Sequence, residues 1–378
     1  MIANKTLMIV SGSAKTLVWF RLELMEEFIK KSFKIIAVAP DDLLEDQKFI
    51  LKKLGIEFVD LSLNRKSLNI IDLLKSIIHL RKKIKKYSPS IVITYTFKAS
   101  IATAFAGLLI KNINIFALVT GRGHIFDNNS IKEIIRMYFG ILGLRLAFKK
   151  MTLVFFQNND DKSLFLEQKI VAQGQARRTN GSGVNLEKFK QSPLPEGPVF
   201  MTMARLIQSK GLIEFAEASK IVKQTYKNAR FLLYGYPDTH SDSISEDEIK
   251  HKWKSEYGIE YLGFSKFPQE TLKQCSVFVL LSYKEGTPRA VLEAMSMGRP
   301  IITTDTVGCR ETVKENYNGY LVPVKNSVAA AEAMLKLVDI KKRSEMGQKS
   351  RLFCEEKFNV RTVNKRLIQE IFDVLPFK

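Results

Sequence analysis

Cysteine is scarce in this chain, with three residues in 378: Cys275, Cys309 and Cys354. They have no paired spacing, which argues against a disulfide framework or a zinc site and favours a reducing compartment. Long apolar runs are also missing, since none reaches the roughly 18 residues that a membrane-spanning helix needs. The first residues show no signal-peptide pattern, because Met1 to Lys5 leads directly into a short apolar stretch. We therefore expect a cytoplasmic protein without a membrane span.

Acidic residues are outnumbered, because 59 Lys and Arg face 39 Asp and Glu, which gives a net charge of +20. Residues 1–190 hold 31 of these cations and 16 of the acids. The cations lie among apolar residues, as in the clusters Arg81, Lys82, Lys83, Lys85 and Lys86, and Arg145, Lys149 and Lys150. Basic amphipathic helices of this kind indicate an anionic membrane surface as partner. A solvated basic face on ordinary helices is the alternative. No aromatic RNA-binding box, zinc knuckle or helix-turn-helix is present, so we expect no nucleic acid partner.

The composition that remains is that of a globular protein, with 46% hydrophobic and 26% charged residues. Short apolar stretches alternate with segments of helical period along the whole chain, which predicts parallel, doubly wound α/β sheets. A segment with three Pro in seven residues, 192–198, reads as a linker. We therefore expect two Rossmann-like domains, 1–190 and 199–359, with a last helix at 360–378 that packs back on the first.

The most informative stretch is residues 277–305, which reads as strand, loop, helix and strand. Pro288 stands where a helix can start, and Gly298 with Pro300 ends it. Open α/β sheets bind ligands at such strand-to-helix loops, and a helix N-terminus favours a phosphate. Glu285 and Glu293 flank this point, and carboxylates accept hydrogen bonds from neighbouring hydroxyls. The pattern fits a sugar nucleotide. Two glutamates at this spacing are common, however, and when they are taken alone helix capping and a solvated helix position explain them better.

The stretch as a whole resembles the Glu-x7-Glu signature of retaining glycosyltransferases of family 4, which have the GT-B fold. It has the Ser-x-x-Glu-Gly-x-Pro opening and the Glu-Ala-Met-x-x-Gly-x-Pro close. The resemblance covers nearly the whole chain and implies two doubly wound domains that face a cleft. It also implies transfer of a sugar from a nucleotide sugar, by a front-face route in which the leaving phosphate takes the acceptor's proton.

The resemblance assigns roles to residues of the second domain. Arg205 and Lys210 match the family's Arg…Lys-Gly motif, and they are expected to stabilise the leaving diphosphate. Glu285 is expected to hold the hexose hydroxyls, and Glu293 the ribose. The predicted catalytic set is Arg205, Lys210, Glu285 and His124. The predicted donor-binding set is Gly12, Gly263, Phe264, Glu285, Gly286, Thr287 and Glu293.

Acceptor residues are expected in the first domain. The loop Gly121-Arg122-Gly123-His124 resembles a family loop near the donor sugar, where His124 could bond a hydroxyl or be only structural. Arg122 and Lys98 are expected to meet the acceptor, because their segments resemble relatives that extend lipid-linked glycans. Among these are bacterial N-acetylgalactosaminyltransferases of N-glycan assembly.

No metal or other cofactor is expected, and the resemblance implies a UDP-sugar as the donor. No Asp-x-Asp motif has a matching site, and Asp41-Asp42 is explained as the start of a helix. The expected reaction is transfer of a hexose or N-acetylhexosamine to a polyprenyl-diphosphate-linked saccharide, by an enzyme that is peripheral on the inner face of the bacterial inner membrane. The alternatives are a GT-B transferase with a soluble sugar or polysaccharide acceptor, and a binding protein without catalysis.

Overall fold

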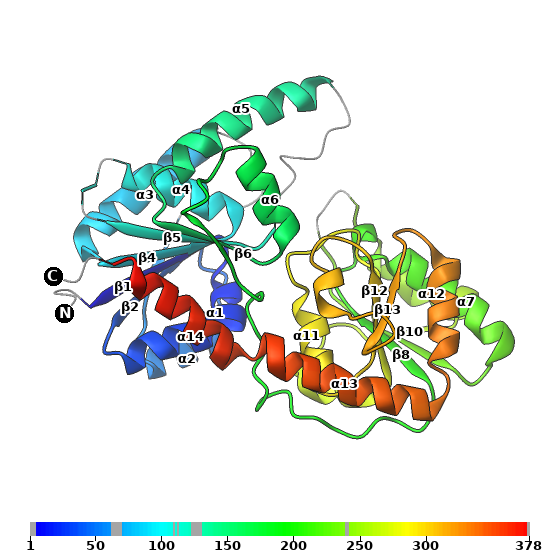
Figure 1. Ribbon diagram of the computed structural model, residues 1–378. Coiled ribbons are helices and arrows are strands. Elements are labelled where there is room, and N and C mark those ends of the chain that lie inside the picture. Colours follow the sequence, from blue (N-terminus) through cyan, green and yellow to red (C-terminus); the bar gives the residue numbers. More distant parts are fainter. Residues whose placement is uncertain are drawn as a thin grey trace. The chain divides into compact units, whose positions relative to one another are not determined.

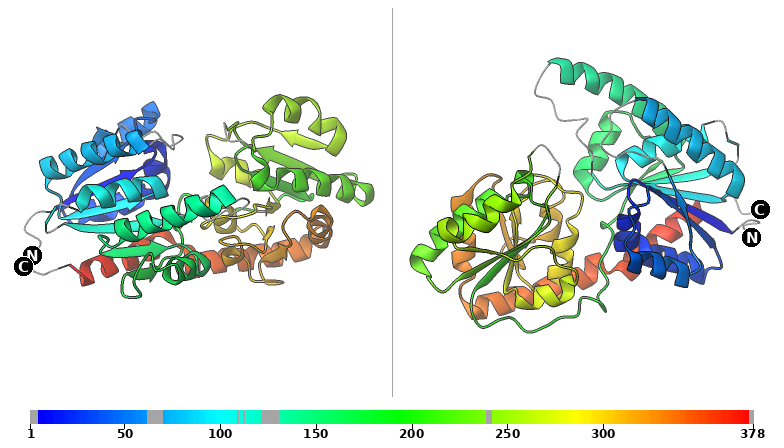
Figure 2. Two further views of the ribbon diagram at one scale, coloured as in Figure 1. Left: turned by 90° about the horizontal axis from the view of Figure 1, so that it is seen from above. Right: turned by 180° about the vertical axis from the view of Figure 1, so that it is seen from behind.

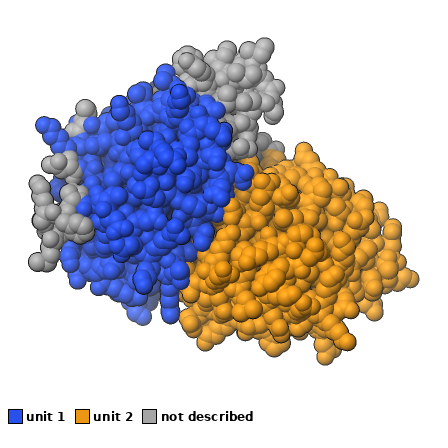
Figure 3. All heavy atoms as spheres, in the orientation of Figure 1, with its two compact units in different colours: residues 1–182, 361–378 blue, residues 183–360 orange. Residues whose placement is uncertain are grey.

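The computed structural model describes residues 5–61, 70–108, 110–111, 113–121, 131–238 and 242–375, with the backbone alone at residues 70 and 131–139. Its contacts divide the chain into two compact units, shown in Figure 3. Unit 1 is Met1–Ser182 together with Arg361–Lys378, and unit 2 is Gly183–Val360. Each unit has its own sheet, with a hydrophobic core on each face of that sheet.

The sheet of unit 1 has seven strands among the described residues, in the order β3-β2-β1-β4-β5-β6-β7. Every neighbouring pair is parallel. The strands are β1 (Thr6–Ser11), β2 (Lys34–Ala39), β3 (Glu57–Asp60), β4 (Ile91–Tyr95), β5 (Asn114–Val119), β6 (Leu153–Phe156) and β7 (Ala176–Arg178). β7 was not predicted, because its three residues, Ala-Arg-Arg, make no apolar run.

Helices cover both faces of this sheet (Figures 1 and 2). They are α1 (Ala14–Lys30), α2 (Glu45–Lys53), α3 (Ile70–Tyr87), α4 (Phe97–Gly107), α5 (Ile131–Phe148), α6 (Asn159–Glu167) and α14 (Val360–Asp373). Successive residues of a strand point to opposite faces. Leu7 and Ile9 of β1 therefore share a core with α1, α2 and α14, whereas Met8 and Val10 share the other core with α3, α4, α5 and α6.

Unit 2 repeats the architecture with six strands in its described part, ordered β10-β9-β8-β11-β12-β13 and parallel throughout. The strands are β8 (Val199–Met203), β9 (Arg230–Tyr234), β10 (Ile259–Tyr261), β11 (Val277–Leu280), β12 (Ile301–Thr304) and β13 (Gly319–Val322). The helices are α7 (Leu212–Thr225), α8 (Glu246–His251), α9 (Trp253–Tyr257), α10 (Pro268–Thr271), α11 (Arg289–Ser296), α12 (Ser327–Lys336) and α13 (Ile340–Phe358). The predicted fold class, two parallel α/β domains, is confirmed.

The proline-rich segment that we expected to be a linker is held within unit 2 by buried arginines. Arg299 is fully buried and donates to the carbonyl oxygens of Ser192 (2.7 Å) and Pro193 (3.2 Å). Arg343 is also fully buried and donates to the carbonyl oxygen of Glu196 (2.8 Å). A buried guanidinium needs such partners, so the segment is anchored rather than loose.

We expected Asp41-Asp42 to start a helix, but α2 begins three residues after Asp42, at Glu45. The Asp42 carboxylate instead accepts hydrogen bonds from Ser13 Oγ (2.6 Å) and the Lys15 backbone N–H (3.0 Å). These groups lie at the start of α1, whose own N-cap residue, Ser13, makes no side-chain cap. A carboxylate from elsewhere in the chain thus satisfies the helix N-terminus.

Candidate active site

The carboxyl edge of the unit 2 sheet collects most of the predicted donor residues. Because all its strands are parallel, the loops that follow them emerge at one edge. Arg205 and Lys210 follow β8, the segment 282–287 follows β11, and Gly263 and Phe264 follow β10. The topology therefore brings residues that are far apart in sequence to one edge.

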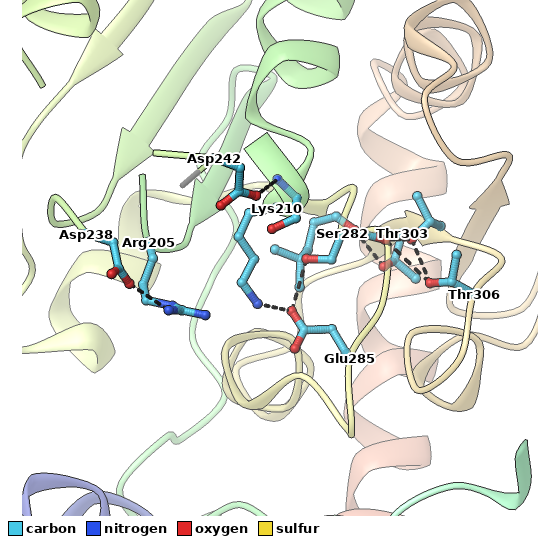
Figure 4. Close-up of polar contacts among 11 residues, drawn as sticks. Arg205, Lys210, Asp238, Asp242, Ser282, Glu285, Thr303 and Thr306 are labelled. Atoms are coloured by element: carbon cyan, nitrogen blue, oxygen red, sulfur yellow. Dashed lines mark hydrogen bonds and ion pairs between the residues drawn. The ribbon is translucent and has the colours of Figure 1, made fainter. Parts of the chain in front are cut away.

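Lys210 and Glu285 form an ion pair at this edge (Figure 4). Each side chain is 17% exposed, so the pair is largely shielded from solvent. Ser282 Oγ donates a hydrogen bond to the same carboxylate oxygen at 3.0 Å, and the Glu285 backbone N–H donates to the Val307 carbonyl oxygen at 3.0 Å. The Glu285 carboxylate is thus fixed by groups from two loops, and its oxygens can accept hydrogen bonds from hydroxyl groups.

Arg205 is paired as well, with Asp238 in the loop after β9, at 2.6 Å between Nη1 and Oδ2 (Figure 4). Both predicted diphosphate-binding cations therefore have acidic partners. A lysine ammonium has three donors and a guanidinium five, so each cation can keep its partner and still donate to phosphate oxygens. The ion pairs orient the cations rather than leave them as mobile surface charges.

The Arg205 loop is braced by the segment that carries Asp238. Asp242 Oδ2 accepts a hydrogen bond from the Ser209 N–H (3.0 Å), and its carbonyl oxygen accepts one from the Gln208 N–H (2.8 Å). Farther along, the Ile244 N–H donates to the Leu206 carbonyl oxygen (2.8 Å). The short 3₁₀ helix η2 (Gln208–Lys210) is thereby tied to the loop after β9.

A close backbone approach brings Lys210 to the Glu285 loop. Gly211 has φ +70, and a Cβ at this position would lie 2.1 Å from the Leu281 carbonyl oxygen, so only glycine fits. Next to it, the Tyr283 N–H donates to the Ser209 carbonyl oxygen (3.0 Å). The Lys-Gly part of the motif therefore combines a cation with the glycine that lets this cation reach the carboxylate.

Tyr283 anchors the same loop to α7. Its hydroxyl donates to Glu214 Oε1 at 2.7 Å, and Lys325 Nζ lies 5.2 Å from the ring centroid. Burial and the Glu214 carboxylate raise the pKa of Tyr283, so the phenol stays protonated and keeps donating.

Glu293 lies in the second turn of α11 and is paired with Arg289, at 3.0 Å between Oε1 and Nε. The two side chains are 14% and 13% exposed. Arg289 Nη1 also donates to the Gly183 carbonyl oxygen at 2.5 Å, which ties α11 to the start of unit 2. The i, i+4 spacing of Arg289 and Glu293 could have revealed this pair in the sequence.

Gly263 and Phe264 form an open corner after β10. Gly263 has φ +71, a Cβ added to it would have no atom within 4 Å, and its carbonyl oxygen accepts from the Gly235 N–H (2.9 Å). Phe264 is 51% exposed, and its ring stands edge-on to Tyr236, with centroids 5.6 Å apart. An exposed ring beside an uncrowded backbone corner offers a flat apolar contact of the kind that suits a base.

Residues 184–353 match the family model of glycosyl transferases group 1, and this range holds the pairs of Lys210 with Glu285 and Arg289 with Glu293. The chain also has curated relatives along most of its length. Over 348 residues it is 25% identical to the N,N'-diacetylbacillosaminyl-diphospho-undecaprenol alpha-1,3-N-acetylgalactosaminyltransferase of Campylobacter jejuni, covering 88% of this chain and 89% of that protein. The chain is a glycosyltransferase.

A second relative supports this identification, and a solved structure supports the fold. The UDP-Gal:alpha-D-GlcNAc-diphosphoundecaprenol alpha-1,3-galactosyltransferase of Escherichia coli is 26% identical to the enzyme over 314 residues, 78% of each chain. The sucrose-phosphate synthase structure from Thermosynechococcus elongatus matches with a TM-score of 0.78 at 17% identity, over 98% of this chain and 99% of that one. The predicted GT-B fold of the glycosyltransferase is thereby confirmed.

Two of the predicted residues in unit 1 of the glycosyltransferase lie at the carboxyl edge of its own sheet. The Gly12 N–H donates to Thr96 Oγ1 at 3.1 Å, which links the loops after β1 and β4. Lys98 lies in the first turn of α4, and burial lowers the pKa of its ammonium while Asp72 opposes this shift. Arg122 and His124 lie outside the described residues.

Several residues of the enzyme's site were not predicted. Asp238, Glu214 and Tyr283 act through partners more than 30 positions away, and no local spacing marks them.

In the described part of the enzyme, no group of three or more His, Cys, Asp or Glu is arranged to hold a metal ion. Among the same residues, no helix has the length and apolar character that crossing a bilayer requires.

Proposed function

We propose that this glycosyltransferase belongs to family 4 and moves a hexose or N-acetylhexosamine from a UDP-sugar to a polyprenyl-diphosphate-linked saccharide, with retention of configuration. The observation that carries the proposal is the shielded Lys210–Glu285 pair at the carboxyl edge of a parallel sheet. It supplies a cation for a phosphate and an oriented carboxylate for hydroxyls within one contact.

The leaving diphosphate gains negative charge as its bond to the sugar breaks. In this proposal Arg205 and Lys210 donate to its oxygens from positions that Asp238 and Glu285 fix in advance. Preorganised donors lower the barrier because no reorganisation is needed when the charge develops. The phosphate oxygen takes the proton of the acceptor hydroxyl, so no carboxylate nucleophile is required, in contrast to retaining hydrolases.

The two glutamates bind the two polyol ends of the donor. Ser282 and Lys210 both contact Glu285 Oε1, so the carboxylate keeps acceptor positions for hydroxyls of the hexose. Glu293 binds the ribose, and Gly286 and Thr287 bind a phosphate at the N-terminus of α11. Phe264 and Gly263 flank the base, and Gly12 lies near the phosphates. His124 contacts the donor sugar, and Arg122 and Lys98 contact the acceptor.

We propose further that no metal ion takes part, because Arg205 and Lys210 supply the positive charge that a metal ion would provide to the diphosphate. Addition of EDTA should leave turnover of a UDP-sugar unchanged, with a Mg²⁺-restored sample as control. A loss that Mg²⁺ restores would contradict this part of the mechanism.

The acceptor proposal rests on the relatives, whose printed names describe undecaprenol-diphosphate substrates. An enzyme with such an acceptor acts at the inner face of the bacterial inner membrane, and the excess of cations in residues 1–190 supports an anionic surface as its partner.

A donor panel tests the whole proposal. The full-length enzyme is given UDP-sugars one at a time, with a polyprenyl-diphosphate-linked saccharide or with free saccharides of the same structure. We expect one UDP-sugar to be consumed with the lipid-linked acceptor and its α configuration to persist in the product. Preference for free saccharides would favour a soluble acceptor, and an inverted product would exclude the retaining mechanism.

A further inference from the structure

Helix α3 is apolar on both of its sides, although the described part of the chain covers only one of them. Leu80 and Ile84 are buried in the core of unit 1, and Leu73 and Ile77 pack against it. Leu74 and Ile78, which lie one turn apart, are nevertheless 52% and 56% exposed. A surface helix normally keeps its outer side polar, so large exposed side chains in a row indicate a surface that meets something apolar.

Cations lie on the same outer side of α3. The exposed positions of the helix are 71, 74, 75, 78, 82, 85 and 86, which recur every three to four residues and so form one stripe. Its first half presents Leu74 and Ile78, and its second half presents Lys82, Lys85 and Lys86. The acid among the described side chains of α3, Asp72, is half-buried and off this stripe.

Helix α5 shows the same combination. Leu142 and Leu146 are 46% and 57% exposed, and Arg145 and Lys149 are exposed beside them at i, i+3, i+4 and i+7. Arg145 stays exposed although its Nε donates to the Gln168 carbonyl oxygen at 2.9 Å. The remaining cation of the predicted cluster, Lys150, is half-buried, and its ammonium donates to the Ile110 carbonyl oxygen at 3.1 Å.

Both stripes lie on one helix layer. The inner sides of α3, α4 and α5 pack into the same core on one face of the unit 1 sheet, and α4 contacts both α3 and α5. Figures 1 and 2 show these three helices together on one side of the sheet, so their outer sides face away from it in the same general direction. Part of each basic cluster thus lies on one surface, which we name the α3–α5 face: Leu74, Ile78, Lys82 and Lys85 of α3, with Leu142, Arg145, Leu146 and Lys149.

We infer that the α3–α5 face docks on an anionic lipid bilayer, with its leucines and isoleucine inserted at the acyl boundary and its cations at the headgroups. Exposed branched side chains next to exposed cations match the chemistry of an interfacial helix, in which apolar area and charge both contribute. A soluble acidic protein would satisfy the cations but would not explain the four apolar side chains. The inference rests on the proposed function, because it names the surface through which the enzyme reaches a lipid-linked acceptor.

Two kinds of substitution separate the contributions. Leu74→Ser with Ile78→Ser removes apolar area from α3, and Lys82→Glu with Lys85→Glu reverses charge there. The matched controls lie on α2, which covers the opposite face of the sheet: Phe49→Ser, which changes a 67% exposed ring, and Lys52→Glu with Lys53→Glu. Circular dichroism and turnover of a short-chain, water-soluble acceptor analogue check that each full-length variant is folded and active.

Binding is measured by sedimentation with vesicles of phosphatidylcholine, with and without phosphatidylglycerol, at low and high salt. We expect the unaltered enzyme to bind the anionic vesicles, more weakly but still detectably at high salt. The apolar variant should lose about tenfold in partitioning and keep no binding at high salt. The charge variant, Lys82→Glu with Lys85→Glu, should lose the part of its vesicle binding that depends on salt. Both α2 variants should bind like the unaltered enzyme.

Several results would overturn the inference. They are absence of binding to anionic vesicles, equal losses in the α2 and α3 variants, and unchanged binding of the apolar variant. A dimer that the apolar variant dissociates, with vesicle binding unaffected, would assign the face to a second copy of the chain. Vesicle binding requires no turnover, so docking through α3 by an enzyme that rejects every lipid-linked acceptor would refute the proposed function alone.

Discussion

Lys210 and Glu285 are coupled, so neither residue can be altered without affecting its partner. Both side chains are largely shielded, and removal of the ammonium would leave a carboxylate in a poorly solvated place. Loss of activity in a Lys210 variant could therefore reflect loss of a catalytic cation or damage to the Glu285 loop. A double substitution distinguishes the two.

We expect Lys210→Met to lower turnover by about 100-fold or more, the scale of losing one preorganised charge partner. It should also destabilise the protein by about 1–3 kcal/mol, because Glu285 loses its cation. Lys210→Met with Glu285→Gln should recover most of that stability in urea unfolding, but its turnover should stay well below that of Glu285→Gln alone. Equal turnover of the double variant and Glu285→Gln alone would show that Lys210 serves only to neutralise Glu285.

The cysteines make a second prediction at the scale of single residues. Burial raises the pKa of the Cys275 and Cys354 thiols to about 12 and also raises the pKa of Cys309. The thiolate is the reactive form, and a raised pKa makes it rarer at any given pH below that value. The native protein should therefore react with a thiol reagent at pH 8 at least about 100-fold more slowly than in urea. Rapid labelling of one thiol in the native state would contradict the buried positions of the three.

Residue spacing predicted part of the site, and the missing part has a physical reason. Motifs that are continuous in sequence, such as Arg205 to Lys210 and Glu285 to Glu293, could be located because one short stretch of the sequence carries each one. Asp238 could not, because its contact with Arg205 depends on how the loop after β9 folds over the loop after β8. For the same reason, no spacing indicated that both predicted cations would be held by carboxylates.

Among the elements, the alternation of apolar runs and helical periods was enough to predict two parallel sheets. The prediction did less well where a contact between elements sets local structure. Asp42 caps α1 instead of starting α2, and residues 192–196 are held by Arg299 and Arg343 instead of forming a free linker. Both outcomes depend on partners at least 27 residues away, which helix-start and linker patterns do not include.

The junction between β8 and α7 makes an element-scale prediction. Gly211→Ala would place a methyl group against the Leu281 carbonyl oxygen and require a left-handed backbone in alanine. We expect a loss of about 3 kcal/mol or more in unfolding free energy, with lower turnover because Lys210 shifts. The matched control is Gly55→Ala, where φ is +66 and no atom lies within 4 Å of the Cβ position.

Gly55→Ala should lower the free energy of unfolding by only about 1 kcal/mol, because only the backbone conformation is strained. It should leave turnover unchanged. Equal losses in the two variants, measured by urea unfolding, would show that the close approach of Gly211 to Leu281 contributes nothing.

At the scale of the whole molecule, the chain crosses between its units twice. Helix α14 follows unit 2 in sequence, yet it completes the core of unit 1 with Leu367, Ile368 and Ile371. Each unit therefore buries its apolar residues separately. A cavity in the core of one unit should destabilise that unit first.

Two reciprocal substitutions test this independence by hydrogen exchange. Ile371→Ala opens a cavity in the unit 1 core and Met334→Ala one in the unit 2 core, and each original side chain is fully buried. Each change should cost about 2–4 kcal/mol, because both the transfer energy and the cavity contribute. With Ile371→Ala, amides of β1 and β4 should exchange faster while those of β8 and β11 keep their protection, and Met334→Ala should show the reverse. Faster exchange in both sheets after either substitution would mean that the two units unfold together as one cooperative body, despite their separate cores.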